Sequence, residues 1–309
     1  MPSRPSRLPR IRHVLAALAL PAALLAGVPA HGQSDADFLA ARAAYDKGDR
    51  TKLAAAAGKL NAHVLSPYVA YWQLKLGLDD ASPVAVRAYL DRYPDTPLAD
   101  RLRADWLKSL GRKALWDRFA LDYVPPPNND DVELACLTVL YKWHRDGDAA
   151  LADAVPLWMT GSATPDACEP AFTALLAKGT LTPADQRARM RLASEANNVK
   201  VAQAVASGFP AKTRLSDRDF AEVNRDPAGA LARGNFAWSN EGGRELALFA
   251  LERAARTDAS AARGPWVKWR DRLPEADRRY GNARLAYHAA RQLNPAANDY
   301  FREAGDVRL

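Results

Sequence analysis

The sequence predicts an all-α protein, built as an irregular solenoid of short helical hairpins. Apolar residues recur every three or four positions along the 309-residue chain, which is the spacing of helices with one buried face. Runs in which β-branched and polar residues alternate, as in a strand, are almost absent. Polar N-cap residues, first-turn prolines and terminal glycines recur regularly. These observations predict about fifteen helices that stack as successive hairpins.

The first thirty residues predict a secretory signal peptide. Four arginines precede an apolar run over residues 14–28, and the small residue Ala30 follows at the position of a cleavage site. The apolar run is shorter than the roughly 20 residues that a helix needs to span a bilayer. We therefore expect residues 1–30 to be removed and residues 31–309 to be periplasmic, without a membrane anchor.

The charge of the chain limits its possible partners. The formal charge is +7 for all residues, and residues 1–30 contribute four arginines and no acidic residue, so 7 − 4 leaves +3 for the rest. Such a weak positive charge argues against a nucleic-acid partner. It remains compatible with an acidic polymer such as peptidoglycan, whose peptide stems carry carboxylates. A hydrophobic content of 48% excludes general disorder.

Capping residues divide residues 34–111 into five predicted helices. Each begins at a polar N-cap, and three of the caps precede a proline, which favours the first helical turn. The predicted N-caps are Ser34, Asp49, Ser66, Ser82 and Thr96. Four of these helices are expected to end at Gly48, Gly77, Pro94 and Gly111. Residues 44–60 also show the helix–Gly-Asp–helix pattern of tetratricopeptide-type units.

The second half of the chain continues the same pattern after an interruption. Three prolines and two asparagines over residues 125–129 favour extended backbone, so a bend or linker is expected there. Helices are then predicted to begin at Thr182, to follow Asn198, and to occupy residues 216–234 (weakly), 241–256, 266–273 and 276–293. In the 241–256 helix, Leu246, Phe249 and Ala250 are expected to face inward, and Glu252 and Arg253 outward.

One helical hairpin holds both cysteines. Apolar residues follow helical spacing before the turn at residues 146–148 and again over residues 151–158, and Thr164 with the following proline is predicted to start a third helix. This arrangement brings Cys136 and Cys168 to the same end of the hairpin. In an oxidising compartment we expect them to form a disulfide, and a pair of free buried thiols is the alternative.

A search for chemical motifs assigns no catalytic residue, no cofactor and no metal ligand. The chain has no Gly-x-Gly fingerprint, no phosphate-binding loop and no Gly-x-Ser-x-Gly. His63, His144 and His288 are far apart in sequence and are expected at the surface or in caps. The nine glutamates are expected on polar helix faces or in first turns, where water keeps them ionised. They are Glu133, Glu169, Glu195, Glu222, Glu241, Glu245, Glu252, Glu275 and Glu303.

The eight tryptophans allow two interpretations. Carbohydrates stack on exposed indole rings, so some of these residues could form a sugar-binding platform. However, the tryptophans lie at helical spacing beside leucines, as core residues do. The core interpretation is the one we favour from the sequence.

Three stretches follow a pattern known from one protein family. The first is LSPYVAYWQL at residues 65–74, and the second is YLDRYPDTPLADRLRADWLKSLGRKALW at residues 89–116. The third lies within the cystine segment and consists of Leu157-Trp158, Thr160-Gly161 and Pro165 to Cys168. Together they resemble the soluble lytic murein transglycosylases, over roughly residues 35–309. The resemblance implies the N-terminal, U-shaped superhelical domain of that family.

The family pattern also implies where the chemistry is expected. In this family a C-terminal lysozyme-like domain cleaves the glycosidic bond of peptidoglycan, with one glutamate as acid and then base. That glutamate stands in a Glu-Ser dipeptide followed by Gly-Leu-Met-Gln, and this sequence contains neither motif. The resemblance therefore implies a superhelical domain over residues 31–309 without the catalytic domain.

Three functional hypotheses follow. The first is a substrate-positioning scaffold of a periplasmic lytic murein transglycosylase, whose partners are peptidoglycan and its own missing catalytic domain. The second is a periplasmic tetratricopeptide-like module that binds protein or peptidoglycan without enzymatic activity. The third, an enzyme with an unrecognised site, is the least supported, because the motif search is empty.

Overall fold

The computed structural model describes residues 35–125 and 130–307, and every regular element in these two ranges is helical. The predicted all-α class is therefore confirmed. The predicted signal peptide and Ser34 lie outside the described residues, as do Pro126 to Asn129 of the predicted bend. Within the described ranges, no helix is both long and apolar enough to cross a membrane. The contacts group the chain into two compact units, which divide between Leu76 and Gly77.

The N-terminal unit is a hairpin with one further helix. It consists of α1 (Asp35–Asp46), α2 (Arg50–Lys59) and α3 (Ser66–Leu76). Its core gathers small and aliphatic residues, among them Ala41, Leu53 and Val69. The rings of Phe38 and Tyr45 stack on the indole of Trp72, with centroids 5.3 and 5.4 Å away. The tetratricopeptide-like pattern of residues 44–60 thus forms a hairpin whose aromatic side chains close the unit.

The C-terminal unit begins with three helices and a short 3-10 turn. These are η1 (Leu78–Asp80), α4 (Pro83–Arg92), α5 (Pro97–Arg112) and α6 (Trp116–Asp122). The predicted caps are confirmed, because the hydroxyls of Ser82 and Thr96 accept hydrogen bonds from first-turn N–H groups. The predicted stop at Gly111 is wrong, since α5 continues through it. A Cβ on Gly111 would lie 3.0–3.2 Å from the Leu137 side chain, so glycine permits close packing against the next helix.

The cystine hairpin is less regular than its sequence pattern predicts. Its first arm is α7 (Val132–Asp146), but the second arm is η2 (Asp148–Ala154) followed by the single turn α8 (Val155–Trp158). The third helix begins with η3 (Asp166–Cys168) and continues as α9 (Glu169–Ala177). Thr164 does not cap it, because its hydroxyl lies beside Arg189 instead.

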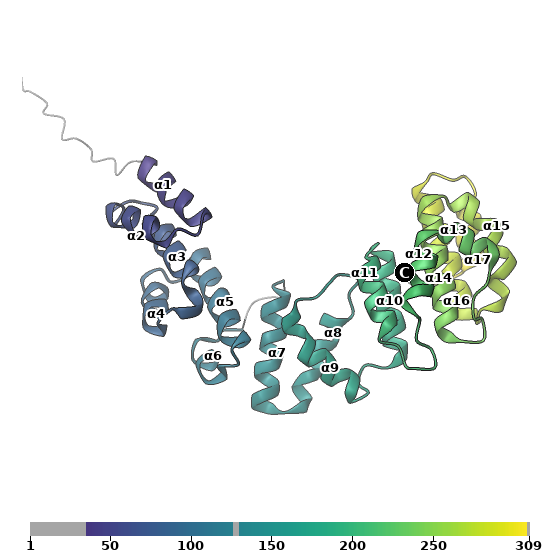
Figure 1. The fold of residues 1–309 in the computed structure, drawn as a ribbon, viewed down its shortest axis with the longest axis horizontal. Coiled ribbons are helices and arrows are strands. Elements are labelled where there is room, and N and C mark those ends of the chain that lie inside the picture. Colours follow the sequence, from purple (N-terminus) through teal and green to yellow (C-terminus); the bar gives the residue numbers. More distant parts are fainter. Residues whose placement is uncertain (1–34, 126–129, 308–309) are drawn as a thin grey trace, which may run out of the picture. The chain divides into compact units, whose positions relative to one another are not determined.

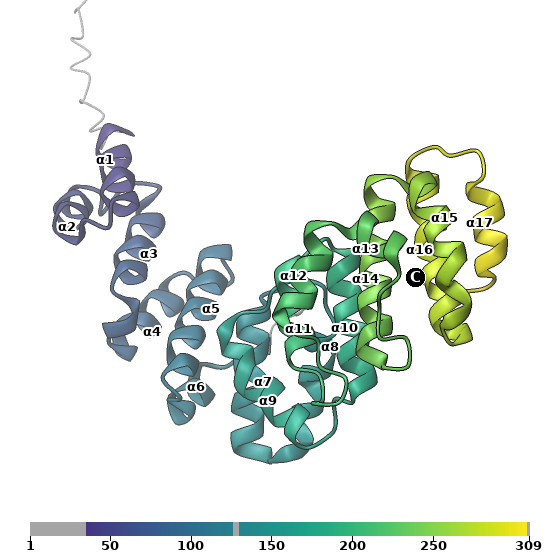
Figure 2. The same ribbon diagram turned by 45° about the vertical axis from the view of Figure 1, so that its right-hand side comes forward.

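Eight further α-helices complete the described chain (Figure 1). They are α10 (Pro183–Glu195), α11 (Val199–Ser207), α12 (Asp217–Arg225), α13 (Pro227–Arg233), α14 (Glu241–Thr257), α15 (Ala259–Trp269, then η4, Arg270–Arg272), α16 (Glu275–Arg291) and α17 (Ala297–Ala304). Figure 2 shows the same succession from a second side. The weak pattern over residues 216–234 resolves into two helices, and α17 is a helix that the sequence did not predict. Helix α14 is the centre of this region, since it packs against α10, α12, α13, α15 and α16.

The two cysteines are bonded and sealed from solvent. Cys136 and Cys168 are joined through their sulfurs, with Cα atoms 4.9 Å apart, and both residues are fully buried. They pack in one hydrophobic cluster with Leu151, Ala154 and Phe172. The bond therefore attaches the start of α9 to α7.

We expect the unfolded, unreduced protein to titrate with no free thiol. In the chain-entropy model the closed loop contributes about 3.7 kcal/mol of stability at most. Replacing both cysteines (C136A/C168A) should therefore lower the free energy of unfolding by up to that amount, as measured by urea denaturation. Two thiols in the unreduced protein would contradict this prediction.

Candidate functional site

A groove of about 980 Å³ opens between the end of α5, the start of α6, α7 and the segment that leads into α9. We call it the aromatic groove. Its walls are mainly apolar and aromatic, with a few charged groups. The lining residues are Gly111, Arg112, Ala114, Trp116, Glu133, Leu137, Leu140, Trp143, His144, Pro165, Asp166, Ala167 and Pro170. This combination of apolar walls and a few polar groups is typical of small-molecule and polymer-binding sites.

Local structure fixes both tryptophans of the aromatic groove. Ala114 has a φ of 53°, a left-handed conformation that turns the chain, so that α6 begins at Trp116. The Trp116 ring packs edge-on against Phe119 at 5.9 Å and lies 6.3 Å from the His144 ring. These contacts leave the indole half-buried, with part of it available to a ligand.

Trp143 is oriented by a hydrogen bond instead. Its Nε1 donates to Oδ1 of Asp148 at 2.9 Å, and Nζ of Lys178 donates to the same carboxylate at 2.6 Å. The hydrogen bonds from Lys178 and Trp143 lower the pKa of Asp148, so this acceptor stays ionised at neutral pH. Trp143 is therefore held in one orientation, as a preformed stacking surface requires.

Charged groups mark the edge of the groove beside α7. Oε1 of Glu133 lies 2.6 Å from Nη1 of Arg112, and both residues line the groove. Outside the lining residues, Nζ of Lys108 lies 2.8 Å from Asp131. Burial opposes ionisation of Asp131, but the hydrogen bonds from Lys108 and the Leu134 N–H outweigh it and lower its pKa. Of these carboxylates, Glu133 lines the groove and can accept hydrogen bonds from a ligand's hydroxyl or amide groups.

The tryptophans thus divide between the two interpretations that the sequence allowed. Trp106, Trp158 and Trp266 are buried at 3, 7 and 0% exposure, as core residues. Trp116 and Trp143 line the groove and remain half-buried. Sequence spacing could not separate the two groups, because a helix repeats its apolar face whether or not a neighbour covers it.

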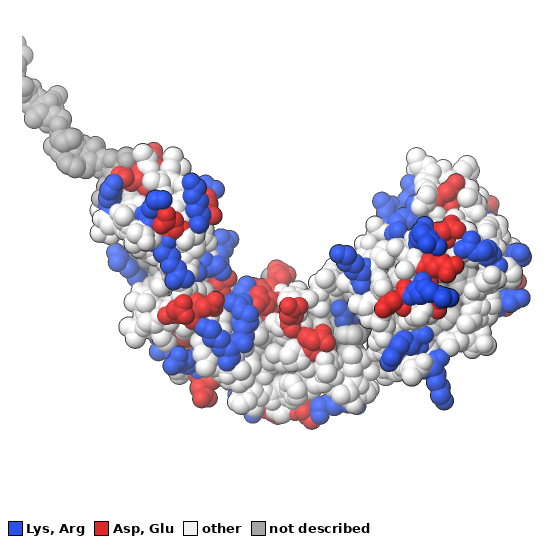
Figure 3. Space-filling view, in the orientation of Figure 1, with Lys and Arg blue, Asp and Glu red and all other residues white. Residues whose placement is uncertain are grey.

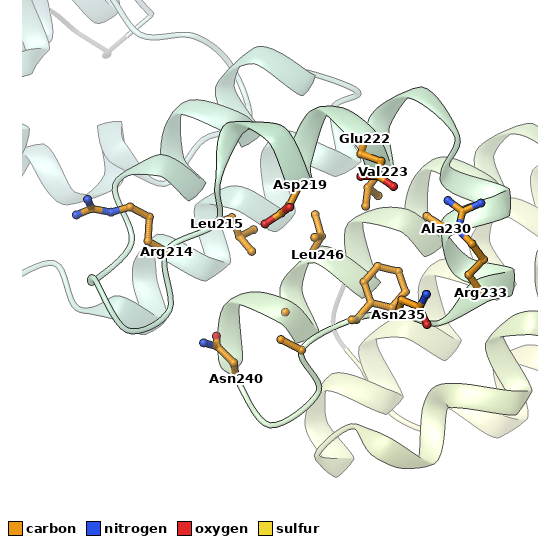
Figure 4. Close-up of a pocket in the computed structure, with 13 residues that line it drawn as sticks. Arg214, Leu215, Asp219, Glu222, Val223, Ala230, Arg233, Asn235, Asn240 and Leu246 are labelled. Atoms are coloured by element: carbon orange, nitrogen blue, oxygen red, sulfur yellow. The ribbon is translucent and has the colours of Figure 1, made fainter.

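A second, more polar cavity of about 350 Å³ lies among α12, α13 and the start of α14 (Figure 4). Asp219 and Glu222, one turn apart on α12, line this cavity together with apolar residues that include Leu215 and Leu246. Figure 4 shows the Arg214 side chain pointing away from the other labelled residues. The cavity offers two exposed carboxylates and suits a ligand that donates hydrogen bonds.

The expectation that all nine glutamates lie on polar surfaces is wrong for two of them. Glu245 and Glu252, both on α14, are each only 2% exposed. Glu252 accepts hydrogen bonds from Arg284 and Arg256 and lies 2.8 Å from Nε2 of His288. His288 is also buried rather than at the surface. Helix α14 contacts neighbours on most of its circumference, so its apparent polar face is covered by the cations of α10 and α16.

The electrostatics of these two glutamates differ. Burial raises the pKa of Glu252, but the hydrogen bonds from His288 and Arg284 outweigh it and lower the value to about 2. Burial raises the pKa of Glu245, against the opposing hydrogen bonds from Arg191. The cavity beside them measures about 10 Å³, which is room for one water at most and not for a sugar ring. These groups therefore join α14 to its neighbours and do not form an accessible site.

Comparison with known proteins gives one consistent relationship. No family model matches the chain. The soluble lytic murein transglycosylase of Salmonella typhimurium strain LT2 is 28% identical over 205 residues, and that of Escherichia coli strain K12 is 27% identical over the same length. The chain is related to the soluble lytic murein transglycosylases. These alignments cover 66% of the chain but 32% of each transglycosylase, so the chain spans about a third of the length of these relatives.

Solved lytic transglycosylase structures agree with this relationship. An inactive mutant of the lytic transglycosylase Slt from Pseudomonas aeruginosa aligns with a TM-score of 0.65 and 26% identity, over 87% of this chain and 44% of that one. The 70 kDa soluble lytic transglycosylase from Escherichia coli aligns with a TM-score of 0.62, and a 70 kDa soluble lytic transglycosylase in complex with bulgecin A with 0.61. The latter two are 23 and 22% identical to the chain and support the fold alone.

The ionic cluster of this lytic transglycosylase relative predicts a specific acid sensitivity. The pKa of Glu252 is about 2 in the folded chain against an ordinary 4.5. A lowered carboxyl pKa stabilises the folded chain at pH values above 4.5, and this stabilisation is lost as the pH falls towards 2. For Glu252 the contribution to the free energy of unfolding is about 3 kcal/mol. We expect E252Q to be less stable at neutral pH and to lose less stability over that acidic range.

The measurement is a urea titration at each of several pH values, followed by a hydrogen-exchange pulse at one fixed pH. Mass spectrometry of the labelled protein would then show the unfolding of α14 and α16. E241Q, which changes a half-buried glutamate at the start of the same helix, is the control and should keep the wild-type pH dependence. Glu245 changes the stability in the opposite direction, because its pKa is raised in the folded chain. Its contribution lowers the free energy of unfolding as the pH rises above 4.5. An unchanged pH slope in E252Q would refute the assignment.

Proposed function

We propose that this chain is a periplasmic, murein-binding helical module that positions peptidoglycan strands for lytic transglycosylase chemistry. The observation that carries the proposal is the aromatic groove, in which Trp116 and Trp143 are held in place beside charged groups. The relationship to soluble lytic murein transglycosylases supports the choice of polymer. Export by the signal peptide expected over residues 1–30 would bring the module to that polymer.

The chemistry of the groove suits a glycan strand. The apolar faces of sugar rings stack on indoles, while carboxylates such as Glu133 and Asp166 can accept hydrogen bonds from sugar hydroxyls and amide N–H groups. Two stacking surfaces of moderate strength give weak binding at any one site. Weak binding is appropriate for a module that moves along a long polymer, because it permits rapid release.

Stacking, rather than bulk charge, is the proposed source of affinity. The net positive charge of residues 31–309 is compatible with attraction to an acidic polymer. In Figure 3, however, lysine and arginine lie interspersed with aspartate and glutamate over the C-terminal helices α14–α17. A surface of mixed sign exerts little net attraction at a distance. We therefore expect only a modest dependence of binding on salt.

The same proposal assigns bond cleavage to a separate domain or protein. Cleavage of a glycosidic bond requires a carboxylic acid beside the bond. Glu245 and Glu252 are buried and ion-paired, and Glu133 is paired with Arg112. Glu222 is the accessible glutamate of the polar cavity, which lies on other helices than the aromatic groove.

Replacing Trp116 should weaken sedimentation of the chain with purified peptidoglycan. We expect W116A to bind several-fold more weakly, because one stacking surface is lost, and W116F to keep part of the affinity. Trp269 is also half-buried but lies on α15, away from the groove. W269A is therefore the control and should bind as the wild type does.

Equal binding by W116A and wild type would remove the aromatic groove from the proposal. Binding of peptides but not of glycan strands to the groove would favour the alternative, a module that recognises proteins.

Incubation of the chain with peptidoglycan should release no soluble muropeptides. The reason is that no glutamate of the aromatic groove is a free, accessible acid in the described structure. Chromatography and mass spectrometry of the supernatant would detect 1,6-anhydro products. Their appearance would refute the prediction, and E222Q and E133Q would then show which open cavity holds the acid.

A further inference from the structure

A further cavity, of about 410 Å³, is lined by a buried arginine without a carboxylate partner. Arg189 on α10 is 6% exposed and lines this cavity together with residues of α8, α9 and α11. Its guanidinium stacks on the Trp158 ring at 3.9 Å and lies 5.6 Å from the Phe172 ring. Among the described residues, no carboxylate oxygen lies within 4.0 Å of it. We call this the Arg189 pocket.

The neighbouring arginines of α10 show what is unusual about Arg189. Arg187 pairs with Glu241 at 2.7 Å, and Arg191 pairs with both Glu245 and Asp277. Both are more exposed than Arg189. The most buried cation of the three therefore lacks the partner that the other two have.

Packing alone does not balance this buried charge. Removing a cation from water costs several kcal/mol, whereas a cation–π contact returns about 2 kcal/mol at best. Burial accordingly lowers the pKa of Arg189, and Glu169 opposes the shift only through its more distant charge. Glu169 lines the same pocket, but its carboxylate accepts a hydrogen bond from Thr173 at 3.2 Å.

Two buried N–H donors of residues that line this pocket also lack acceptors. Neither Nε of Arg189 nor Nε1 of Trp158 has a hydrogen-bond partner among the described residues. Nη2 of Arg189 makes a long contact of 3.4 Å with the hydroxyl of Thr164. Buried donors are normally satisfied, so the pocket has an excess of donors and positive charge.

We propose that the Arg189 pocket binds the C-terminal carboxylate of a peptide whose last residue is small and apolar. A carboxylate supplies the missing negative charge and can accept two hydrogen bonds from one guanidinium. Small and aliphatic residues, namely Ala163, Val201, Ala204, Val205 and Gly208, form walls that suit a methyl-sized side chain. The volume is at the low end for ligand sites, enough for a peptide end of one or two residues.

This inference goes beyond the proposed function and does not depend on it. The same carboxylate chemistry occurs at the ends of cell-wall peptide stems and at the ends of ordinary proteins, which differ in the chirality of the last residue. N-acetyl-D-alanyl-D-alanine and N-acetyl-L-alanyl-L-alanine therefore serve as the probes, and their methyl esters as matched ligands without the charge.

Titration of the full chain with each probe, by calorimetry and by the NMR shift of the Trp158 indole N–H, tests the site. We expect at least one free acid to bind with a Kd of about 1 mM or tighter. Its methyl ester and the variant R189M should each reduce the affinity about tenfold or more, because the charge-assisted hydrogen bonds are lost. R187M removes a paired arginine of the same helix and should bind as the wild type does.

The outcomes separate the sources and the alternatives. Preference for the D-peptide identifies cell-wall stems as the ligand, and preference for the L-peptide identifies protein C-termini. Equal binding of both shows that the pocket recognises the carboxylate alone. Failure of both acids to bind, or equal affinity for acid and ester, would overturn the proposal. The ester comparison uses the wild-type chain, so it holds even if R189M folds poorly.

Discussion

The disulfide between Cys136 and Cys168 is the constraint on which both proposed binding sites depend. It attaches Cys168 to α7, and Pro165, Asp166 and Ala167, which directly precede Cys168, form one wall of the aromatic groove. Ala163, Thr164 and Glu169 of the same segment line the Arg189 pocket. Gly161 allows the backbone to approach α10 closely, because a Cβ at this position would lie 2.3 Å from the Leu192 carbonyl oxygen. The segment that leads into α9 thereby forms a wall that the aromatic groove and the Arg189 pocket share.

The cluster around α14 shows a different way of holding helices together. A helix that contacts several neighbours has no free polar face, so its glutamates must be neutralised where they are buried. Arg284 neutralises Glu252, which also contacts the His288 ring, and Arg191 neutralises Glu245. Ion pairs of this kind gain little over apolar packing, but the loss of one partner leaves an unpaired buried charge and is strongly destabilising. Their contribution here is to fix the position of α14 relative to α10 and α16.

Local rules predicted the fold better than they predicted the sites. The caps at Asp49, Ser82, Thr96 and Thr182 are local hydrogen bonds between neighbouring residues, and the structure contains each of them. The errors concern Gly111, Thr164, Glu245, Glu252 and His288, whose roles depend on helices distant in sequence. The two tryptophans of the aromatic groove and Arg189, which has no carboxylate partner, belong to the same class. The periodicity of one helix does not indicate whether a neighbouring helix supplies a partner. Helix α17 was not predicted because its N-terminus has no side-chain cap.

The hydrophobic clusters of the described chain have a consequence for its cooperativity. One cluster lies within α1–α3, a second surrounds the disulfide, and a third extends from Met190 to Ala297, and the three share no residue. In stacked helical proteins, stability is a sum of local terms and nearest-neighbour interfaces. Segments that form such separate clusters can therefore melt at different temperatures. One such segment can therefore unfold locally while the segment around the disulfide stays folded.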